Sequence, residues 1–307
     1  MQFLDTQLTE QMNCTPHVQP FFHEATNTFS YVMSDPTSKA CAVIDSVIDF
    51  DLPSGTISYE SADAIIKYIK SKDLSVEWHL ETHMHADHLS AAMYLKDKLG
   101  GQVAIGKHIS DVQAMYHDVF AVSEEELEQA RNSFDHLWED EETFMLGTIP
   151  AFTFYAPGHT PADIVYGIGD ALFVGDSLFQ PDFGSARCDF PGGDASAMYD
   201  AVQKIYQLPE SMRLFVCHDY LPKAGRTEYR AETTVAIQKN SNIHLASGTQ
   251  KETFVKTRET RDATLSLPKL MIPSLQVNVR AGSIPTVAGK PVLQLPINSV
   301  FSKYPKS

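Results

Sequence analysis

The sequence predicts an α/β fold, on two observations. Short apolar runs with the length of strands alternate, through most of the chain, with segments whose apolar residues recur at helical spacing. The 307 residues, 43% hydrophobic and 21% charged, supply enough apolar mass for a large core in one domain, with room for an elaboration. We therefore expect a main domain built from strands and helices in turn.

The first half of the chain gives the clearest alternation. Residues 21–46 contain two β-rich runs, because the letters SDP at 34–36 are typical of a hairpin turn. In 58–70 four apolar residues share one helical face. The elements that we expect here are two strands within 21–46, a helix at 58–70, a strand at 76–80, a helix from about Leu89 to the Gly100-Gly101 pair, and a strand at 102–105.

The second half continues the pattern after an acidic stretch at 118–142, which we interpret as a surface helix and loop. From His244 onward the chain is rich in Pro and Thr, and we expect loops with short strands there. We therefore predict a main domain at 1–243 and a C-terminal extension, 244–307, packed on the same domain. The other expected elements are strands at 151–155, 164–168 and 171–174, a helix at 197–206, a strand at 213–217 and a helix at 227–239.

Charge and composition exclude several classes of function. A net charge of −15 without a long basic run argues against nucleic acid as a partner. The first residues lack the basic and apolar regions of a secretory signal, and no run of about 18 apolar residues predicts a membrane span. The four cysteines lack both CxxC spacing and the density of a disulfide scaffold, so we expect reduced thiols in a cytoplasmic protein.

The strongest chemical pattern is the run HMHADH at 83–88, which directly follows the apolar strand predicted at 76–80. It places three imidazoles and a carboxylate, from His83, His85, Asp87 and His88, in a loop at a strand end. Imidazole and carboxylate together suit transition metals such as zinc and iron better than calcium or magnesium. The run therefore predicts a transition-metal site.

Three shorter motifs strengthen this prediction. His159 lies in APGHTP, Asp176 in VGDS and His218 in VCHDY, and each follows a predicted strand. A single PGHTP is more often only a turn. The three motifs in this order after HMHADH indicate one metal site gathered from several loops.

Together the motifs resemble the metallo-β-lactamase superfamily, whose αββα sandwich gathers such loops at one edge of two facing sheets. The resemblance covers roughly residues 21–239. Within that superfamily, THMHADHLSAA, APGHTP, GDSLF, ARCDF and CHDY look like the persulfide dioxygenases, also called sulfur dioxygenases. Ala86 within HADH and the Arg-x-Asp-Phe motif that begins at Arg187 are the features that most closely resemble these dioxygenases. The stretch PKAGRTEYRAETT and the long tail depart from the short animal-type pattern, which indicates a bacterial branch.

The resemblance implies an enzyme that oxidises glutathione persulfide with O2 to sulfite and glutathione, in sulfide oxidation. It implies one Fe(II) per chain, held by His83, His159 and Asp176. Three ligands on one face leave other positions open, and Fe(II), unlike zinc, can pass electrons to oxygen. The main domain, 1–243, would then be the catalytic domain, with the αββα sandwich followed by a C-terminal extension.

Four further polar residues have two possible roles. In the dioxygenase they would orient ligands and water as catalytic groups, whereas in a hydrolase they would complete a second zinc site. The alternative function is therefore a zinc-dependent thioester hydrolase of the glyoxalase II type, and the ligand inventory alone does not decide between them. The four residues are His85, Asp87, His88 and His218.

Substrate recognition requires basic groups, because glutathione persulfide carries two carboxylates and this chain is acidic. The motifs place Arg187 and Tyr220 near the predicted metal, and the resemblance supports both. Arg226 and Arg230 are candidates by position, although solvated helix charges explain them equally well. The sequence leaves the oligomeric state open, a homodimer included.

Overall fold

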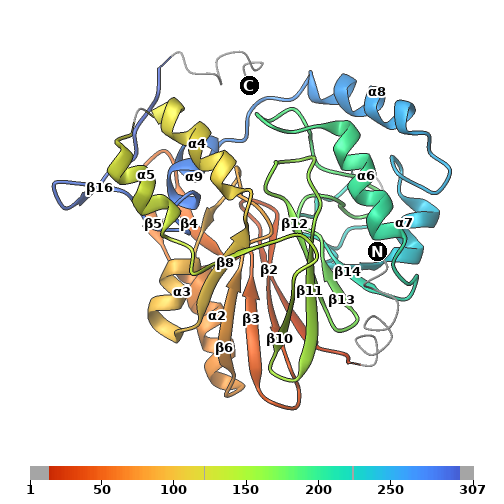
Figure 1. Ribbon diagram of the computed structural model, residues 1–307, viewed down its shortest axis with the longest axis horizontal. Coiled ribbons are helices and arrows are strands. Elements are labelled where there is room, and N and C mark those ends of the chain that lie inside the picture. The colour runs from red at the N-terminus through yellow and green to blue at the C-terminus, as the bar shows by residue number, and fades with distance from the viewer. Residues whose placement is uncertain (1–13, 121, 223–224, 298–307) are drawn as a thin grey trace.

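Two six-stranded sheets stand face to face at the centre of the molecule, with helices on both outer sides (Figure 1). This computed structural model describes residues 14–120, 122–222 and 225–297. Residues 1–13, to which the expectation of no secretory signal applies, lie outside the described residues. The chain has the predicted α/β architecture in the form of an αββα sandwich.

The first sheet takes its strands from the first half of the chain and has the order β1-β2-β3-β6-β8-β9. Its strands are β1 (His17–His23), β2 (Thr28–Ser34), β3 (Ala40–Ile44), β6 (Ser75–Leu80), β8 (Gln102–Gly106) and β9 (His136–Trp138). The last four run parallel, β3 with β6, β6 with β8 and β8 with β9. A small sheet at one end joins β4 (Val47–Asp51), β5 (Thr56–Ser58) and β7 (Leu89–Ser90).

The second sheet has the order β10-β11-β12-β13-β14-β15. Its strands are β10 (Thr143–Leu146), β11 (Ile149–Tyr155), β12 (Ile164–Ile168), β13 (Ala171–Phe173), β14 (Arg213–Phe215) and β15 (Glu232–Thr234). A turn at Gly169-Asp170 joins β12 to β13 in antiparallel register. The pair β13 and β14 is parallel, and the intervening chain crosses over through a helix.

Apolar side chains on both faces of the strands explain why each sheet is covered on both sides. In β2, Tyr31 and Met33 enter the core between the two sheets, whereas Val32 packs outward in a second core. Helix α2 places Ile65 and Ile69 in that outer core. Side chains at successive strand positions point to opposite faces, so a strand that is apolar throughout must be buried on both.

The helices divide between the two outer faces (Figure 1). Helices α2 and α3 cover the first sheet, and α6 and α7 lie on the side of the second. In α6, Met198, Val202 and Ile205 pack against the second sheet, at the helical spacing expected from the sequence. The helices before residue 244 are α2 (Glu60–Ser71), α3 (Ala92–Leu99), α4 (Ile109–Phe120), α5 (Glu124–Arg131), α6 (Ala195–Tyr206) and α7 (Val235–Ser241).

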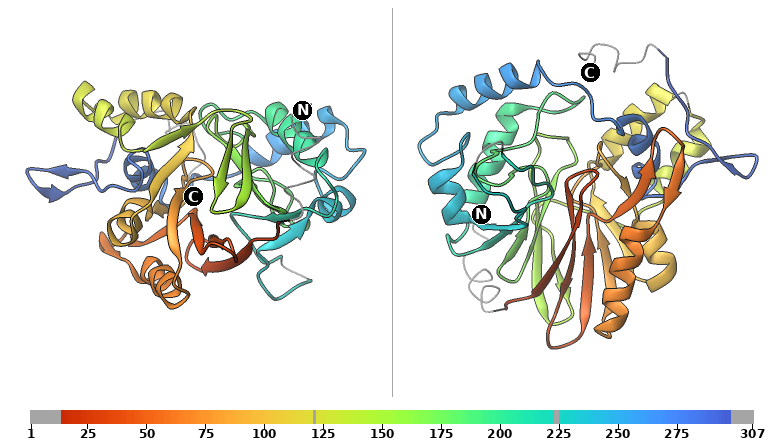
Figure 2. Two further views of the ribbon diagram at one scale, coloured as in Figure 1. Left: turned by 60° about the horizontal axis from the view of Figure 1, so that its bottom comes forward. Right: turned by 180° about the vertical axis from the view of Figure 1, so that it is seen from behind.

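The C-terminal extension corrects our prediction of loops with short strands. It contains the helices α8 (Lys251–Asp262) and α9 (Met271–Asn278), and only then the two-residue strands β16 (Thr286–Val287) and β17 (Lys290–Pro291). Helix α8 runs beside α6, whereas α9 lies on the other side, near α4 (Figure 2). The boundary between 1–243 and 244–307 stays a prediction.

The two helices were missed because neither has an apolar stripe. The buried positions of α8 are Phe254, Arg258 and Asp262, spaced four residues apart, and the last two are charged partners of each other. Helix α9 is buried almost all round and includes Pro273. Periodicity searches recognise an apolar face opposite a polar one, so they fail on both patterns.

Several other boundaries differ from the expected ones. The helix predicted at 227–239 is instead the strand β15 followed by the short helix α7, because Thr234 caps the helix by accepting from the Ile237 N–H. Residues 89–90, expected to begin a helix, form β7, and β9 lies within the acidic stretch predicted as helix and loop. None of the helices in the described ranges is long and apolar enough to span a membrane.

Candidate metal centre

The predicted ligand residues come together at one edge of the two sheets. His83 follows β6, His159 follows β11, and Asp176 and His218 follow the parallel strands β13 and β14. The two sheets meet here through a 2.9 Å hydrogen bond from the Ile164 N–H to the Thr82 carbonyl. Loops from both sheets can therefore supply side chains to one small volume.

His83, His159 and Asp176, here called the triad, form one compact group. Their potential ligand atoms all lie within 4.8 Å of one another, and all three residues are buried. The Oδ2 atom of Asp176 is 4.0 Å from the His83 Nε2 and 3.4 Å from the His159 Nε2. Two imidazole nitrogens and a carboxylate oxygen thus converge on one point.

Hydrogen bonds to the far side of each ring determine which nitrogen faces that point. The Thr82 hydroxyl donates to the Asp45 carboxylate at 2.8 Å, so its oxygen accepts from the His83 Nδ1–H, 3.0 Å away. The His159 Nδ1–H donates to the Arg187 carbonyl at 2.7 Å. Both rings therefore hold their proton on Nδ1 and leave a lone pair on Nε2, the state that a metal ligand needs.

The turn that carries His159 is fixed by a carboxylate. Asp163 accepts from the backbone N–H groups of His159 and Thr160 and from the Thr160 hydroxyl. Burial, the largest effect, raises the pKa of Asp163 to about 6 against these bonds. Gly158 lies so close to α6 that a Cβ atom would lie 2.5 Å from the Met198 Cα, so the turn requires glycine.

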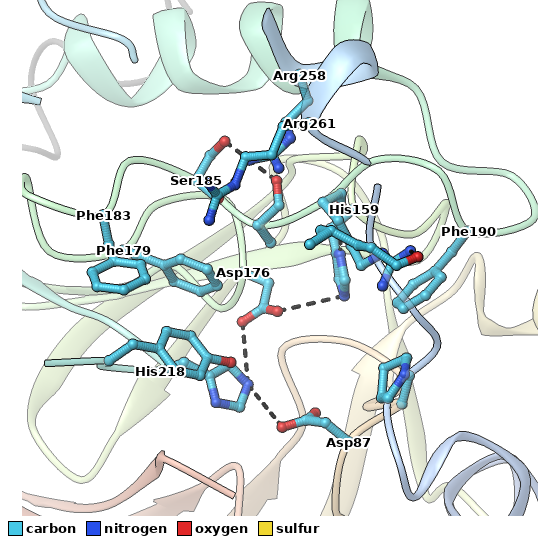
Figure 3. Close-up of a pocket in the computed structure, with 16 residues that line it drawn as sticks. Asp87, His159, Asp176, Phe179, Phe183, Ser185, Phe190, His218, Arg258 and Arg261 are labelled. Carbon is cyan, nitrogen blue, oxygen red and sulfur yellow. Dashed lines mark hydrogen bonds and ion pairs between the residues drawn. The ribbon is translucent and has the colours of Figure 1, made fainter. Parts of the chain in front are cut away.

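The other four ligand candidates, His85, Asp87, His88 and His218, are here called the second group. Their potential ligand atoms also lie within 4.8 Å of one another. The His218 Nε2 is 3.4 Å from Asp87 and 3.5 Å from the second oxygen of Asp176, which therefore links the two groups (Figure 3). The structure thus brings together all seven predicted ligand and catalytic residues.

His85 is held by two buried carboxylates. Its Nε2 is 3.0 Å from Asp45 and 3.2 Å from Glu81, while Ser90 donates to Glu81 at 2.6 Å. Burial lowers the pKa of His85, but the attraction of Asp45 and the hydrogen bonds to both carboxylates outweigh it and raise the pKa. His83 has the opposite shift, because burial and then the neighbouring histidines lower its pKa.

The C-terminal extension holds the histidine-rich loop in place. The side-chain amide of Asn278, at the end of α9, donates to the carbonyls of His85 and His88 at 2.8 Å each, and its oxygen accepts from the Ser90 N–H. A buried amide that bonds three backbone groups fixes the path of the loop. Asn278 and Glu81 were both missed from the sequence, although Glu81 stands directly before THMHADH.

Unpartnered atoms test whether a metal ion fits this cluster. Buried polar atoms without a hydrogen bond are costly and therefore rare. Within the described ranges, six such atoms gather here and face one another; they are His83 Nε2, His85 Nδ1, Asp87 Oδ2, His88 Nε2, Asp176 Oδ1 and His218 Nε2. Divalent cations bound at the triad and the second group would satisfy them, and this nitrogen and oxygen donor set fits iron or zinc.

A cavity of about 300 Å³ opens beside the triad. Asp87, His159, Asp176 and His218 line its metal end (Figure 3). Its other walls are aromatic, aliphatic and basic, with side chains from Phe179, Phe183, Phe190, Tyr220, Leu265, Pro268, Arg187, Arg258 and Arg261. Away from the metal end, the charged side chains on its walls are arginines, in a chain whose net charge is −15.

The structure separates the four predicted substrate-binding residues. Arg187 and Tyr220 line the cavity, whereas Arg226 and Arg230 line a different hollow, beside Asp182. The Arg187 guanidinium bonds both oxygens of Asp189 and the Ser266 carbonyl, and stacks over the Phe190 ring. Burial acts to lower the pKa of Arg226, but its ion pairs with Asp182 and Asp219 raise it. The substrate-binding roles of these three arginines and of Tyr220 stay predictions.

Two cavity arginines, Arg258 and Arg261, were not predicted from the sequence. Both come from α8 and reach the cavity beside Ser185 (Figure 3). No motif marks them, and only the packing of α8 on the main domain brings them near the triad.

A family model described as the metallo-beta-lactamase superfamily matches residues 24–218, which include all seven ligand candidates. The chain belongs to this superfamily. A solved structure with the superfamily's fold, ETHE1 from Myxococcus xanthus, aligns with a TM-score of 0.69 at 24% identity, covering 87% of this chain and 100% of that one.

Three relatives within the superfamily differ in name and in distance. The chain is 44% identical over 297 residues to a beta-lactamase hydrolase-like protein of Xylella fastidiosa, covering 96% of this chain and 68% of that protein. It is 41% identical over 276 residues to glyoxylase B2 of Dictyostelium discoideum, covering 88% and 93%. It is 26% identical over 255 residues to the mitochondrial persulfide dioxygenase ETHE1 of Bos taurus, covering 82% of each.

Proposed function

We propose that this chain is an iron-dependent dioxygenase that oxidises glutathione persulfide with O2 to sulfite and glutathione. The observation that carries the proposal is the cavity beside the triad, which joins a two-histidine, one-carboxylate face to walls lined with arginines. The face suits Fe(II), which, unlike zinc, would pass electrons from the persulfide sulfur to dioxygen. The similarity to a relative named persulfide dioxygenase supports the same function.

The residues of the chain have separate tasks in this proposal. Asp176 and the two Nε2 atoms of His83 and His159 hold the iron, one per chain. The aromatic walls, among them Phe179 and Phe190, exclude water from a reactive sulfur. The arginines offer hydrogen-bond donors to the anionic tripeptide, which a chain of net charge −15 would otherwise repel.

A zinc-dependent thioester hydrolase is the second candidate. The unpartnered atoms of His88 and His218 favour it, because they could complete a second metal site with Asp87 and Asp176. The name of the relative glyoxylase B2 points the same way. The same cavity would then bind a glutathione thioester.

Oxygen consumption separates the two functions. Protein loaded anaerobically with iron is mixed with glutathione persulfide in an oxygen electrode, and sulfite is measured in the same sample. We expect the iron-loaded protein to take up oxygen and to form a matching amount of sulfite. Protein purified from cells grown without added metal should contain one iron per chain. Two stoichiometric zincs, hydrolysis of S-lactoylglutathione and no oxygen uptake would instead establish the hydrolase.

A further inference from the structure

The three arginines that line the cavity differ in what they already bind. Arg258 is buried, and its guanidinium bonds the Asp262 carboxylate and the Ser185 carbonyl. Arg187 bonds both oxygens of Asp189. These two arginines are thus neutralised by carboxylates of the chain itself.

Arg261 differs from both. It lies one helical turn after Arg258 on α8 and is exposed. Among the residues that the structure describes, its guanidinium has no hydrogen bond or ion pair. Arg261 therefore brings an uncompensated positive charge to the cavity wall, with five donors available to a ligand.

The position of α8 is fixed, so this charge stands at a defined place. Asp262, next to Arg261, accepts from Arg258 and also from the backbone N–H of Cys188. Phe254, one end of the same buried stripe, packs in the core beside α6. Helix α8 is therefore anchored to the loop that carries Arg187, on the side of the cavity away from Asp87 (Figure 3).

We propose that Arg261, supplied by the C-terminal extension, is the specificity-determining residue that binds a carboxylate of the thiol substrate at the end of the cavity opposite the metal. This proposal rests on the proposed function for the identity of the thiol, glutathione, but not for the reaction. The substrate sulfur would lie near the triad, and the carboxylate would form a charge-assisted pair with the Arg261 guanidinium. Arg258 and Asp262 act as positioning residues that hold the helix.

The test measures binding in addition to turnover. Reduced glutathione is titrated calorimetrically, under anaerobic conditions, into iron-loaded wild-type protein, Arg261→Gln and Lys256→Gln. Lys256 is a matched control, because it is exposed on the same helix and lies roughly 140° around it from Arg261. Glutathione diethyl ester, which lacks both carboxylate charges, is the second probe.

We expect Arg261→Gln to weaken glutathione binding about tenfold at low salt, and less at high salt, because an exposed pair is screened. Lys256→Gln should bind glutathione like the wild type, and the ester should bind all three proteins equally. In turnover, Arg261→Gln should raise the KM for glutathione persulfide and leave kcat unchanged, with iron content and melting temperature as in the wild type.

Three results would overturn the proposal. They are unchanged glutathione binding by Arg261→Gln, equal weakening by Lys256→Gln, and no measurable binding of glutathione to the wild-type protein. The proposed function fails separately. If no oxygen is consumed but Arg261→Gln still weakens glutathione binding, the carboxylate site stands and the dioxygenase is wrong.

Discussion

The triad and the second group are held by the protein to different degrees. The triad rings of His83 and His159 are fixed by hydrogen bonds of 3.0 and 2.7 Å on their Nδ1 atoms. In the second group, the Nδ1 atoms of His88 and His218 have partners only at 3.3 to 3.5 Å. Short bonds of this kind fix ring orientation and tautomer, so the triad rings are prearranged for a metal, whereas the rings of His88 and His218 are more adaptable.

The largest expected effect is loss of the metal from the triad. His83→Ala or His159→Ala should abolish iron binding, because two remaining ligands cannot hold a labile divalent ion. Metal analysis after purification and desalting measures this directly. A variant that kept full iron and full oxygen uptake would remove that histidine from the ligand set.

Asp45 should have the next largest effect, because it supports both groups. It bonds His85 directly and reaches His83 through the Thr82 hydroxyl. Asp45→Asn should lower the free energy of unfolding by about 3–5 kcal/mol, the usual cost of breaking a buried pair. Asp49→Asn is the control, since Asp49 meets His23 at a partly exposed position. Equal urea midpoints for the two variants would contradict the structural role of Asp45.

His218 distinguishes the second group from the triad most directly. Replacing it by alanine should leave iron bound and slow turnover about 10- to 100-fold, the typical cost of losing a group that orients ligands or water. Iron content and kcat are measured on the same preparation. Complete loss of iron would instead make His218 a ligand and erase the difference between the groups.

Substitution of Arg187 should have the smallest effect, and it tests the side of the triad that faces the cavity. Its carbonyl fixes His159, while its guanidinium lies in the cavity wall. If the Arg187 guanidinium bonds a substrate carboxylate in addition to Asp189, Arg187→Lys should raise the KM for glutathione persulfide about tenfold, because lysine lacks the planar fork, and leave iron content unchanged.

The control for this substitution is Arg213→Lys. Arg213 also pairs with a carboxylate, Glu232, and stacks over a phenylalanine, but in the second sheet. Arg213→Lys should only lower the melting temperature. If Arg187→Lys does the same, Arg187 stabilises the fold through its pair with Asp189 and does not bind the substrate.

Some elements around the site could be predicted from the sequence, and helix α8 could not. The strands β6, β11 and β12 and the helix α6 follow from local patterns, and they are found close to the expected positions. Helix α8 could not be predicted, because its buried stripe includes the charged pair Arg258 and Asp262. Burial of a charge depends on a partner, and the pattern of a single segment does not record what that segment packs against.

The sequence by itself determined the α/β order and the residues able to bind a metal, because strand ends, glycine turns and imidazole clusters are local features. The resemblance named the triad in advance, but only the tertiary structure shows how the side chains of the two groups are held, since that depends on bonds from Thr82, Glu81 and Asn278. It also decided that the C-terminal extension carries Arg261 to the cavity. Such contacts join residues far apart in the chain, and no local spacing specifies them.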